Sequence, residues 1–463
     1  MTGFARQVHA EWTKLRTVRR WVIALGGAVI LSVLLSVFAA SASRTDANSD
    51  PRIVAGPDGG PVADDVVFAH QRLTGDVTVT AHVVAQADSH EWAAAGIMAK
   101  DGTTGGSRYA AIAVTPRHGT RLLADFTHDE LAGSGSWLRL VRSGPTVTGF
   151  WSADGRTWQQ SGIPARLPAT VEIGLFVTSP PRVVVERGPG STAMGELRTE
   201  GRAVFDAVSI NGTTPRLRVT TVGTSEGMMS QSGGTATVTG SGAMGPNPPP
   251  DDVVQVSLFG MLAGVLVLVA VGTLFLTSET RRGLLRTTLT ANPHRGRVLA
   301  AKAVVLGGVA FGVALAAGVT AFAAAQPLLR DRGWTPPAFP YAGLSDPPVW
   351  RALLMTAAFA AAVAVFTLAV ATITRHSAAT IAGVAALLVL PLIVGSAVPH
   401  RAAQVLMLVT PAGGFATQRV KPPTEALVDP TATVSGGWGL AVAVLYAAAA
   451  LAGAGYVLRR RDA

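Results

Sequence analysis

Six long apolar runs stand out from a chain that is otherwise polar, and each is long enough to cross a bilayer as a helix. A bilayer core of about 30 Å requires roughly 20 apolar residues in α-helical conformation. The central turns of all six runs lack acidic and basic side chains. We therefore expect six transmembrane helices, at residues 21–42, 254–277, 303–325, 350–374, 378–398 and 438–458.

A different pattern fills the chain between the first and second apolar runs. Short strings of alternating apolar and polar residues, such as VTVTAHVVAQ, YAAIAVT and VEIGLFVT, are separated by Gly, Pro, Asp and Ser. Alternation of this kind, with turn signals at regular intervals, is typical of all-β sandwiches. We expect an antiparallel β-sandwich over residues 66–211, within a non-membrane segment that covers residues 43–252.

Residues 212–252 are rich in Gly, Ser, Thr and Pro and end in the run GAMGPNPPPDD. A proline-rich segment is extended and semi-rigid, so we expect a tether that returns the chain to the membrane. Two strings within it, LRVTTVG and GTATVTGSG, alternate as strands do and remain candidates for further pairing.

The first twenty residues predict a short amphipathic helix. Apolar residues recur at helical spacing, and basic residues occupy the other faces. The apolar positions are Phe4, Val8, Trp12 and Leu15. Such a helix lies in the plane of the membrane interface. We expect residues 1–20 to lie on the cytoplasmic face, where contacts with membrane lipid or a docking partner fall to Trp12, Lys14 and Arg16. A simple positively charged flank for the first span is the alternative.

The composition strengthens the membrane assignment. Of the 463 residues, 49% are hydrophobic and 14% are charged, whereas ordinary soluble domains carry about 25% charged residues. The chain has no cysteine, which excludes disulfides and thiolate metal sites.

The net charge of +10 is unevenly distributed along the chain. Residues 44–252 carry 17 Lys and Arg against 21 Asp and Glu, whereas the rest of the chain carries 21 against 7. The positive charge therefore lies beside the apolar runs. This is the pattern of topology signals rather than of a nucleic-acid surface, so we expect no nucleic-acid partner.

Basic residues in the short flanks define an orientation, because cytoplasmic loops carry the excess of Lys and Arg. With six spans, both termini and the loops after the second and fourth spans lie on one side, and these segments are rich in arginine. We expect both termini in the cytoplasm and residues 43–252 outside the cell, in a multi-pass protein of the plasma membrane. The string AASAS after the first run is similar to a signal-peptidase site, but a run of about 22 residues exceeds the usual signal core of about 7–15.

The order of motifs within the predicted sandwich resembles that of concanavalin-like and laminin-G-like domains. The run EWAAAGIMAKDG precedes a W-x-R-L-x-R strand, an S-x-D-G-x-x-W hairpin and a closing AVFDAVSI strand. The matching residues are Trp137, Arg139, Leu140, Arg142, Ser152, Asp154, Gly155, Trp158, Phe205, Asp206 and Val208. The resemblance implies a jelly-roll, a fold that hosts many functions and identifies no ligand.

Several side chains of this domain are candidates for specific roles. We expect Trp137 and Trp158 to bury their rings between the sheets. Trp92 and Trp151 are candidates for stacking on a sugar ring. Three carboxylates could suit Ca²⁺ or a glycosidase pair, but an exposed loop is the favoured explanation for them: Asp125, Asp129 and Glu130. No nucleophile–base pattern accompanies them, and we expect neither a metal site nor a cofactor.

The loop after the second span, residues 278–302, carries the most informative motif. A short helix begins at Glu279 and is broken at Asn292-Pro293. The string E-x-R-R-G-L-L-R-x-T-L-x-x-x-P-x-R-x-R-V-L-x-A-K resembles permease subunits of type-2 ABC exporters. The N-terminal EWTKLRTVRRW resembles actinobacterial members, and AAQVLMLVTPAGG, within residues 399–437, resembles the re-entrant external segment of that family.

This resemblance implies a dimer of two permeases, homomeric or heteromeric, driven by separate cytoplasmic ABC ATPases that contact residues 279–302. It assigns ATPase docking to Glu279, Arg281, Arg282 and Arg286. Contacts with either the ATPase or anionic lipid headgroups fall to Arg295, Arg297 and Lys302. The usual first external loop of the family is short, so residues 43–252 are a departure that leaves the cargo open.

The sequence therefore predicts the permease subunit of an ATP-driven exporter. The chain lacks the G-x-x-x-x-G-K-[ST] phosphate-binding loop, so we expect no enzyme activity of its own. Spans without buried charge favour an amphiphilic or hydrophobic cargo. The alternative function is a membrane-anchored receptor for glycans or cell wall. A membrane enzyme is less favoured, because no span carries paired His, Asp or Glu residues.

Overall fold

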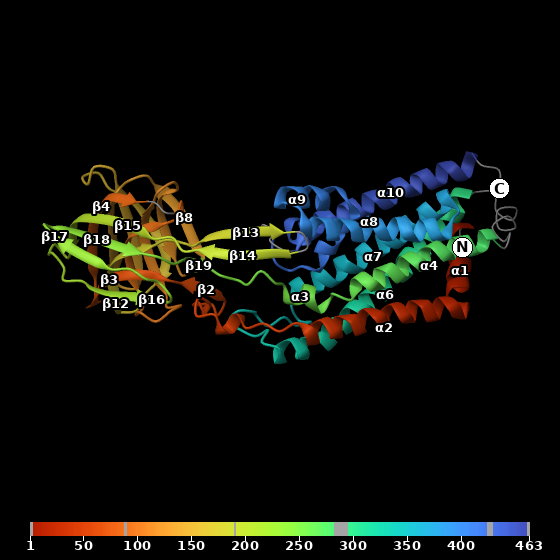
Figure 1. Ribbon diagram of the computed structural model, residues 1–463, viewed down its shortest axis with the longest axis horizontal. Helices are drawn as coiled ribbons and strands as arrows, with labels where there is room; N and C mark the ends of the chain where they lie inside the picture. The colour runs from red at the N-terminus through yellow and green to blue at the C-terminus, as the bar shows by residue number, and fades with distance from the viewer. Residues whose placement is uncertain (1–2, 88–89, 189–190, 282–294, 424–428, 461–463) are drawn as a thin grey trace.

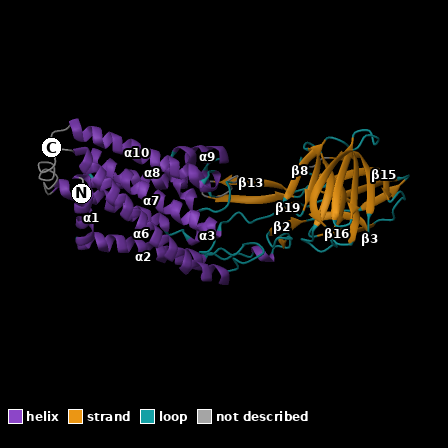
Figure 2. Cartoon of the chain, turned by 180° about the vertical axis from the view of Figure 1, so that it is seen from behind, coloured by secondary structure: helices purple, strands orange, loops and turns teal. Residues whose placement is uncertain are grey.

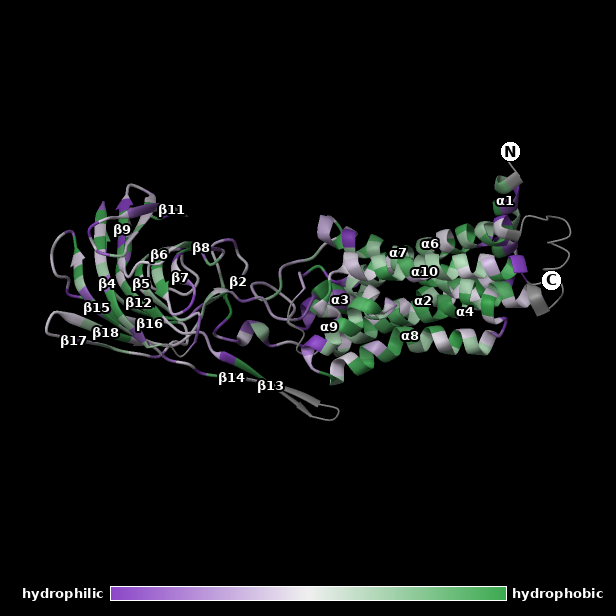
Figure 3. Cartoon of the chain, turned by 90° about the horizontal axis from the view of Figure 1, so that it is seen from above, coloured by the Kyte–Doolittle hydropathy of each residue, from purple (hydrophilic) through white to green (hydrophobic). Residues whose placement is uncertain are grey.

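The computed structural model describes residues 3–87, 90–188, 191–281, 295–423 and 429–460. The molecule is elongated, with a bundle of helices at one end and a β-sandwich at the other (Figures 1 and 2). Two chain segments connect the two parts, the β13–β14 hairpin projects from the sandwich, and α1 and the end of α10 lie at the far end of the bundle (Figures 1 and 3).

The helices follow the apolar runs, because an α-helix satisfies its own backbone polar groups in an apolar medium. They are α1 (Gly3–Thr17), α2 (Arg19–Ala42), α3 (Val253–Ser257), α4 (Met261–Arg281), α6 (Arg295–Asp331), α7 (Pro347–Thr374), α8 (Ser377–Ala397), α9 (His400–Val409) and α10 (Gly436–Arg460). Three 3₁₀ helices connect them, η1 (Ala47–Ser49), η2 (Pro411–Gln418) and η3 (Pro430–Thr433).

Within the described residues, six helices are long and apolar enough to cross a membrane: α2, α4, α6, α7, α8 and α10. These correspond to the six predicted spans, and their apolar surfaces extend along the whole bundle (Figure 3). The second predicted span differs in one respect, since it is divided into α3 and α4. The peptide N–H of Gly260 at this break donates to the Ser36 hydroxyl of α2 (3.0 Å), which satisfies a backbone group that the helix leaves free.

The strands form two seven-stranded antiparallel sheets and two smaller ones. One large sheet has the order β11 (Gln159–Arg166), β10 (Thr146–Ser152), β9 (Trp137–Ser143), β4 (Val77–Ala87), β15 (Gly201–Ile210), β18 (Thr235–Gly240) and β17 (Met229–Ser232). The other has the order β16 (Arg218–Val222), β3 (Val66–Thr74), β12 (Thr170–Thr178), β5 (Ala94–Lys100), β6 (Tyr109–Thr115), β7 (Gly119–Ala124) and β8 (His128–Gly133).

The smaller sheets adjoin the two connections to the bundle. A three-stranded sheet consists of β1 (Val54–Ala55), β2 (Pro61–Asp64) and β19 (Met244–Pro246), and a hairpin consists of β13 (Arg182–Gly188) and β14 (Ser191–Leu197). The strands β16, β17, β18 and β19 lie in the segment that the sequence analysis interpreted as a tether. The extended connection to α3 is therefore shorter than expected and begins after Pro246.

The sandwich has a core on each face of its second sheet. Between the large sheets lie alternating residues of most of their strands, such as Ile97, Ile112 and Leu175, all fully buried. On the other face of the same sheet, Phe68 and Phe176 belong to a second apolar cluster that includes residues of the three-stranded sheet. Sequence alternation alone suggested one buried face per strand, whereas β5 and β12 are buried on both.

Charged groups are also buried on that second face. Lys100 and Asp64 are fully buried, and their Nζ and Oδ2 atoms are 2.6 Å apart. His70 belongs to β3, and its Nδ1 lies 2.7 Å from Oε2 of Glu172 in β12. The His70 ring stacks on Phe68. The Lys100–Asp64 pair joins β5 to β2, so the three-stranded sheet is held to the sandwich by an ion pair as well as by apolar contact.

The prediction that Trp137 and Trp158 lie between the sheets is wrong. Inward positions of β9 are taken by Leu138 and Leu140, so the alternation of the strand turns Trp137 outward. The Trp137 ring stacks on His82 at a centroid distance of 4.4 Å. The Arg139 guanidinium lies 3.9 Å from the centroid of the Trp158 ring, so both rings pack on polar side chains.

Replacing Lys100 should test how much the buried ion pair contributes to the stability of the sandwich. Lys100→Met leaves the Asp64 carboxylate buried without its cation, which should destabilise the sandwich by about 3–5 kcal/mol. Adding Asp64→Asn should recover most of the loss, because no uncompensated charge remains. Denaturant unfolding of the full chain, followed by sandwich tryptophan fluorescence, measures both changes.

The matched control is Arg108, whose ion pair with Asp125 is 3.1 Å long and has a half-exposed guanidinium. Arg108→Gln should change the unfolding free energy by less than about 1 kcal/mol. Equal losses of unfolding free energy for Lys100→Met and Arg108→Gln would show that the buried pair stabilises the fold no more than the exposed one.

Candidate functional site

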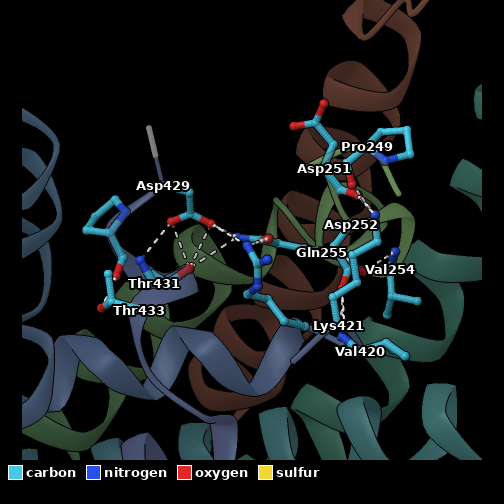
Figure 4. Close-up of polar contacts among 12 residues, drawn as sticks. Pro249, Asp251, Asp252, Val254, Gln255, Val420, Lys421, Asp429, Thr431 and Thr433 are labelled. Atoms are coloured by element: carbon cyan, nitrogen blue, oxygen red, sulfur yellow. Dashed lines mark hydrogen bonds and ion pairs between the residues drawn. The ribbon is translucent and has the colours of Figure 1, made fainter. Parts of the chain in front are cut away.

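A cluster of polar side chains occupies the end of the bundle nearest the sandwich (Figure 4). We call Asp252, Gln255, Arg419, Lys421 and Asp429 the junction cluster. Asp252 and Gln255 belong to the start of α3, where the chain returns from the sandwich, whereas the other three belong to the connection between η2 and α10. The cluster therefore joins two segments that are about 170 residues apart in sequence.

Asp252 is the centre of this cluster and is only 3% exposed. Its Oδ1 accepts from the backbone N–H groups of Val254 (2.9 Å) and Gln255 (3.2 Å), which caps α3. Its Oδ2 accepts from the N–H groups of Val420 (2.7 Å) and Lys421 (2.9 Å). One carboxylate thus both begins a helix and holds a distant loop against it.

A second set of contacts surrounds Gln255. Its amide Nε2 donates to Asp429 Oδ2 at 2.6 Å, and its Oε1 accepts from Arg419 Nη1 at 3.1 Å. The same Arg419 nitrogen lies 3.1 Å from Asp429 Oδ2. Asp429 also caps η3 through the N–H of Thr431. Because the Arg419 side chain is 5% exposed, water screens this ion pair weakly.

Lys421 connects the cluster to the proline-rich return segment. Its ammonium donates to the carbonyl oxygens of Pro249 and Asp251. Burial lowers the pKa of Lys421, while the neighbouring Asp252 and Asp251 carboxylates act in the opposite direction. The last residues before α3 are therefore held from the bundle side by one cation.

The far end of the bundle has a buried ionic contact of its own. Lys302 of α6 lies with Nζ 2.8 Å from Glu11 Oε2 of α1, and both side chains are almost fully buried. Lys14 contacts the other oxygen of Glu11 at 2.9 Å. This arrangement fixes α1 across the beginning of α6. The Lys302 ammonium is thus enclosed in the protein, where neither lipid headgroups nor an ATPase reach it.

The structure describes only some of the remaining residues predicted for docking or for the membrane interface. Trp12 is 43% exposed, and Arg16 and Arg297 are exposed as well. Arg282 and Arg286 lie outside the described residues, and the side chains of Glu279, Arg281 and Arg295 are likewise outside the description. The docking assignments for those residues stay predictions.

The two tryptophans considered for sugar stacking are engaged within the protein. The Trp92 ring stacks on His118 at a centroid distance of 3.5 Å, and the Arg121 guanidinium lies 5.3 Å from its centroid. The Trp151 ring packs on the backbone of Gly133, where a Cβ atom would come within 2.2 Å of it. Trp92 is nevertheless 40% exposed, so sugar stacking stays a prediction, and the close fit of Trp151 explains the glycine at position 133.

Two of the three acidic residues considered for calcium or hydrolysis are paired with arginines, and Glu130 lies 3.5 Å from His128. Asp125 contacts Arg108, and Asp129 contacts Arg121 Nε at 2.5 Å. Burial raises the pKa of Asp125. Within the described residues, no group of three or more His, Cys, Asp or Glu side chains is placed to hold a metal ion.

Sequence reasoning missed the junction cluster. Asp252 directly precedes an apolar run, which is a helix-capping signal, and Asp429-Pro430 is a typical helix start. Arg419 and Lys421 lie within the expected external loop at residues 399–437 and belong to no motif. The capping signals identify the local role of each aspartate, but not the segment that its second oxygen binds.

Comparison with known proteins gives little further guidance. No protein-family model matches the chain, and no curated protein matches it. A solved structure of a functionally unknown protein from Saccharomyces cerevisiae is 16% identical with a TM-score of 0.21, covering 32% of this chain and 75% of that one. SCP-B, an eqolisin-family peptidase in complex with the tripeptide Ala-Ile-His, is 10% identical with a TM-score of 0.21, covering 38% and 98%. Likenesses this weak carry no argument about this chain.

The two oxygens of Asp252 allow a selective test of the junction cluster. Asp252→Asn can keep one oxygen for the α3 cap, but its NH₂ group then faces the N–H groups of Val420 and Lys421. Losing two hydrogen bonds to a carboxylate should speed amide exchange in residues 419–423 roughly tenfold or more. Hydrogen–deuterium exchange with peptide mapping measures the change.

Asp346 provides the control, because its Oδ2 accepts from the N–H of Gly343 (2.7 Å) before α7, outside the cluster. Asp346→Asn should leave exchange in residues 419–423 unchanged. Unaltered exchange there in Asp252→Asn would mean that the loop is held by its other contacts.

Proposed function

We propose that this chain is the permease subunit of an ATP-driven ABC exporter. The observation that supports it best is the packing of the bundle. In the apolar stretch of each helix, 61% of the residues are buried in α4 and in α7, and 50% are buried in α6. Only 17% are buried in α2 and in α10. An anchor needs only one span, but a set of helices packed around one another is what a path across a membrane requires.

The polar groups inside the bundle support an amphiphilic or hydrophobic cargo. Among the described side chains of the six long helices, the one buried charge is Lys302, which Glu11 neutralises. The other buried polar groups are hydroxyls and an amide, and Thr273 and Thr367 bond the backbone of their own helices. A path for an ion or a strongly charged solute would need charged partners along it.

The proposed orientation gives each end of the bundle a role. In this proposal the far end is cytoplasmic, so the loop between α4 and α6 faces two separate ATPases, and the chain has no nucleotide site of its own. The contact of Glu11 with Lys302 ties α1 to α6. A push on the loop would therefore reach α1 and two spans together.

The sandwich is then an extracellular jelly-roll that acts in recognition or assembly, next to the exit of the bundle. The junction cluster supports this role, because it ties the return segment from the sandwich to the loop beside η2. The segment η2 packs in turn on α7, where Phe415 meets Phe359 edge to face at 5.0 Å. We further propose that two permease subunits pair in the plasma membrane.

The absence of cysteine makes orientation simple to test by labelling. Ser230 is exposed on the sandwich and Thr17 is exposed at the end of α1. In intact cells a membrane-impermeant maleimide should label Ser230→Cys and leave Thr17→Cys unlabelled. Both should react after permeabilisation. Labelling of Thr17→Cys in intact cells would reverse the orientation.

Co-purification tests the exporter assignment itself. Affinity purification from the native membrane should retrieve a nucleotide-binding ATPase, and the double reversal Glu279→Lys with Arg282→Glu should reduce its recovery at least about tenfold, as loss of charge pairs at an interface does. Arg401→Glu, an exposed reversal at the opposite end on α9, is the control and should retain it.

Repeated purification without any ATPase, although the chain is folded and correctly oriented, would contradict the exporter assignment. It would favour the receptor function, in which the sandwich binds glycan or cell wall. ATPase recovery that survives the double reversal would keep the exporter and remove the docking assignment.

A further inference from the structure

A cleft of about 520 Å³ lies where the sandwich meets its two connections to the bundle. Its walls come from the outgoing segment around Arg52, from sandwich loops around Thr224, and from the returning prolines at 248–250. This volume is within the range of small-molecule sites, which is roughly 300–1,000 Å³.

The cleft has an excess of negative charge. Four carboxylates and two guanidinium groups line it. The Arg52 guanidinium is shared between Asp50 and Glu196, and Arg198 pairs with Glu226 at 2.6 Å. Both lining cations are therefore already matched by carboxylates, and Asp65 and Asp251 remain.

Asp65 is the better defined of these two carboxylates, because it is 3% exposed. Both of its side-chain hydrogen bonds reach Oδ1, from the N–H and the hydroxyl of Thr224. Among the described residues, no hydrogen bond or ion pair reaches Oδ2. Burial raises the pKa of Asp65 and the neighbouring Asp64 carboxylate adds to this, while the Thr224 hydrogen bonds and the Arg52 guanidinium act in the opposite direction.

Asp251 lines the cleft from the return segment, and its side chain is exposed. The nearest cation of the junction cluster is Lys421, which binds the Asp251 carbonyl oxygen from the bundle side. This one cation serves two carboxylates, because Asp252 and Asp251 both favour the charged form of Lys421 against its burial, and Asp252 Oδ2 also accepts its backbone N–H. The junction cluster therefore does not cancel the charge of the cleft.

The walls of the cleft are held in place before any ligand binds. Asn247 in the return segment donates from its side chain to the Arg52 carbonyl oxygen (3.2 Å) and from its backbone to the Pro61 carbonyl oxygen (3.0 Å). The proline run next to it has little freedom. A preformed site spends less binding free energy on ordering its walls.

We infer that this cleft binds an organic cation with an apolar body. Asp65 Oδ2 and the Asp251 carboxylate supply the charge for an ammonium or phosphonium centre, and Ile53 with the three prolines supplies apolar surface for its substituents. An anion of the same shape meets two unpaired carboxylates and is rejected. The site belongs to the sandwich and its connections, so it exists whether the chain is an exporter or a receptor.

Two ions of matched shape test the inference, the tetraphenylphosphonium cation and the tetraphenylborate anion. Isothermal titration of the purified full chain in detergent, corrected with titration into empty micelles, should give saturable one-site binding of the cation only. Asp65→Asn and Asp251→Asn should each weaken cation binding roughly three- to tenfold, the range for removing one partly solvated ion pair.

Glu130→Gln is the control, since Glu130 is an exposed carboxylate of β8 that does not line the cleft. It should bind the cation as the unaltered chain does. Equal binding of tetraphenylborate, or unchanged cation affinity in Asp251→Asn, would overturn the inference. Asp251→Asn decides the matter even if Asp65→Asn fails to fold, because the Asp251 side chain is exposed. ATP and the ATPase are absent from this measurement, so its failure leaves the exporter proposal intact.

Discussion

The Asp252 carboxylate accepts hydrogen bonds from four backbone N–H groups, two in the first turn of α3 and two in the loop after η2. The first turn of a helix has unpaired N–H groups, and each one is costly where it is buried from water. One carboxylate satisfies this requirement for α3 and also for a loop about 170 residues away. The position of the loop, and of η2 packed on α7, depends on this shared acceptor.

The same physical problem appears at the far end of the bundle. Lys302 enters the apolar interior at the beginning of α6, and an unpaired ammonium there would be strongly unfavourable. Glu11 of α1 neutralises it, so the amphipathic helix is bound to the bundle by charge as well as by Leu15. Polar contacts thus define both ends of the bundle, while apolar packing fills the length between them.

Inside the sandwich, buried charge has a comparable organising role. Lys100 and Asp64 join the three-stranded sheet to a large sheet, and that small sheet continues into both connections with the bundle. The cleft lies next to these connections, with Asp65 adjacent to Asp64 in sequence. The two neighbouring carboxylates therefore have different roles. Asp64 is paired with Lys100 and stabilises the fold, whereas Asp65 has no ion pair among the described residues and lines the cleft.

The sequence by itself determined the six long helices, their approximate limits and the presence of an antiparallel sandwich between the first two. These features are local, because a span satisfies its own backbone and a strand shows its buried face by alternation. Only the tertiary structure decided that Trp137 faces outward, that Lys302 pairs with Glu11, and that Arg419 and Asp429 meet Gln255. Such contacts depend on which distant segments meet, and the residue types alone do not encode that. The sequence does not show whether a buried aspartate caps a helix, pairs with a lysine or lines a cleft.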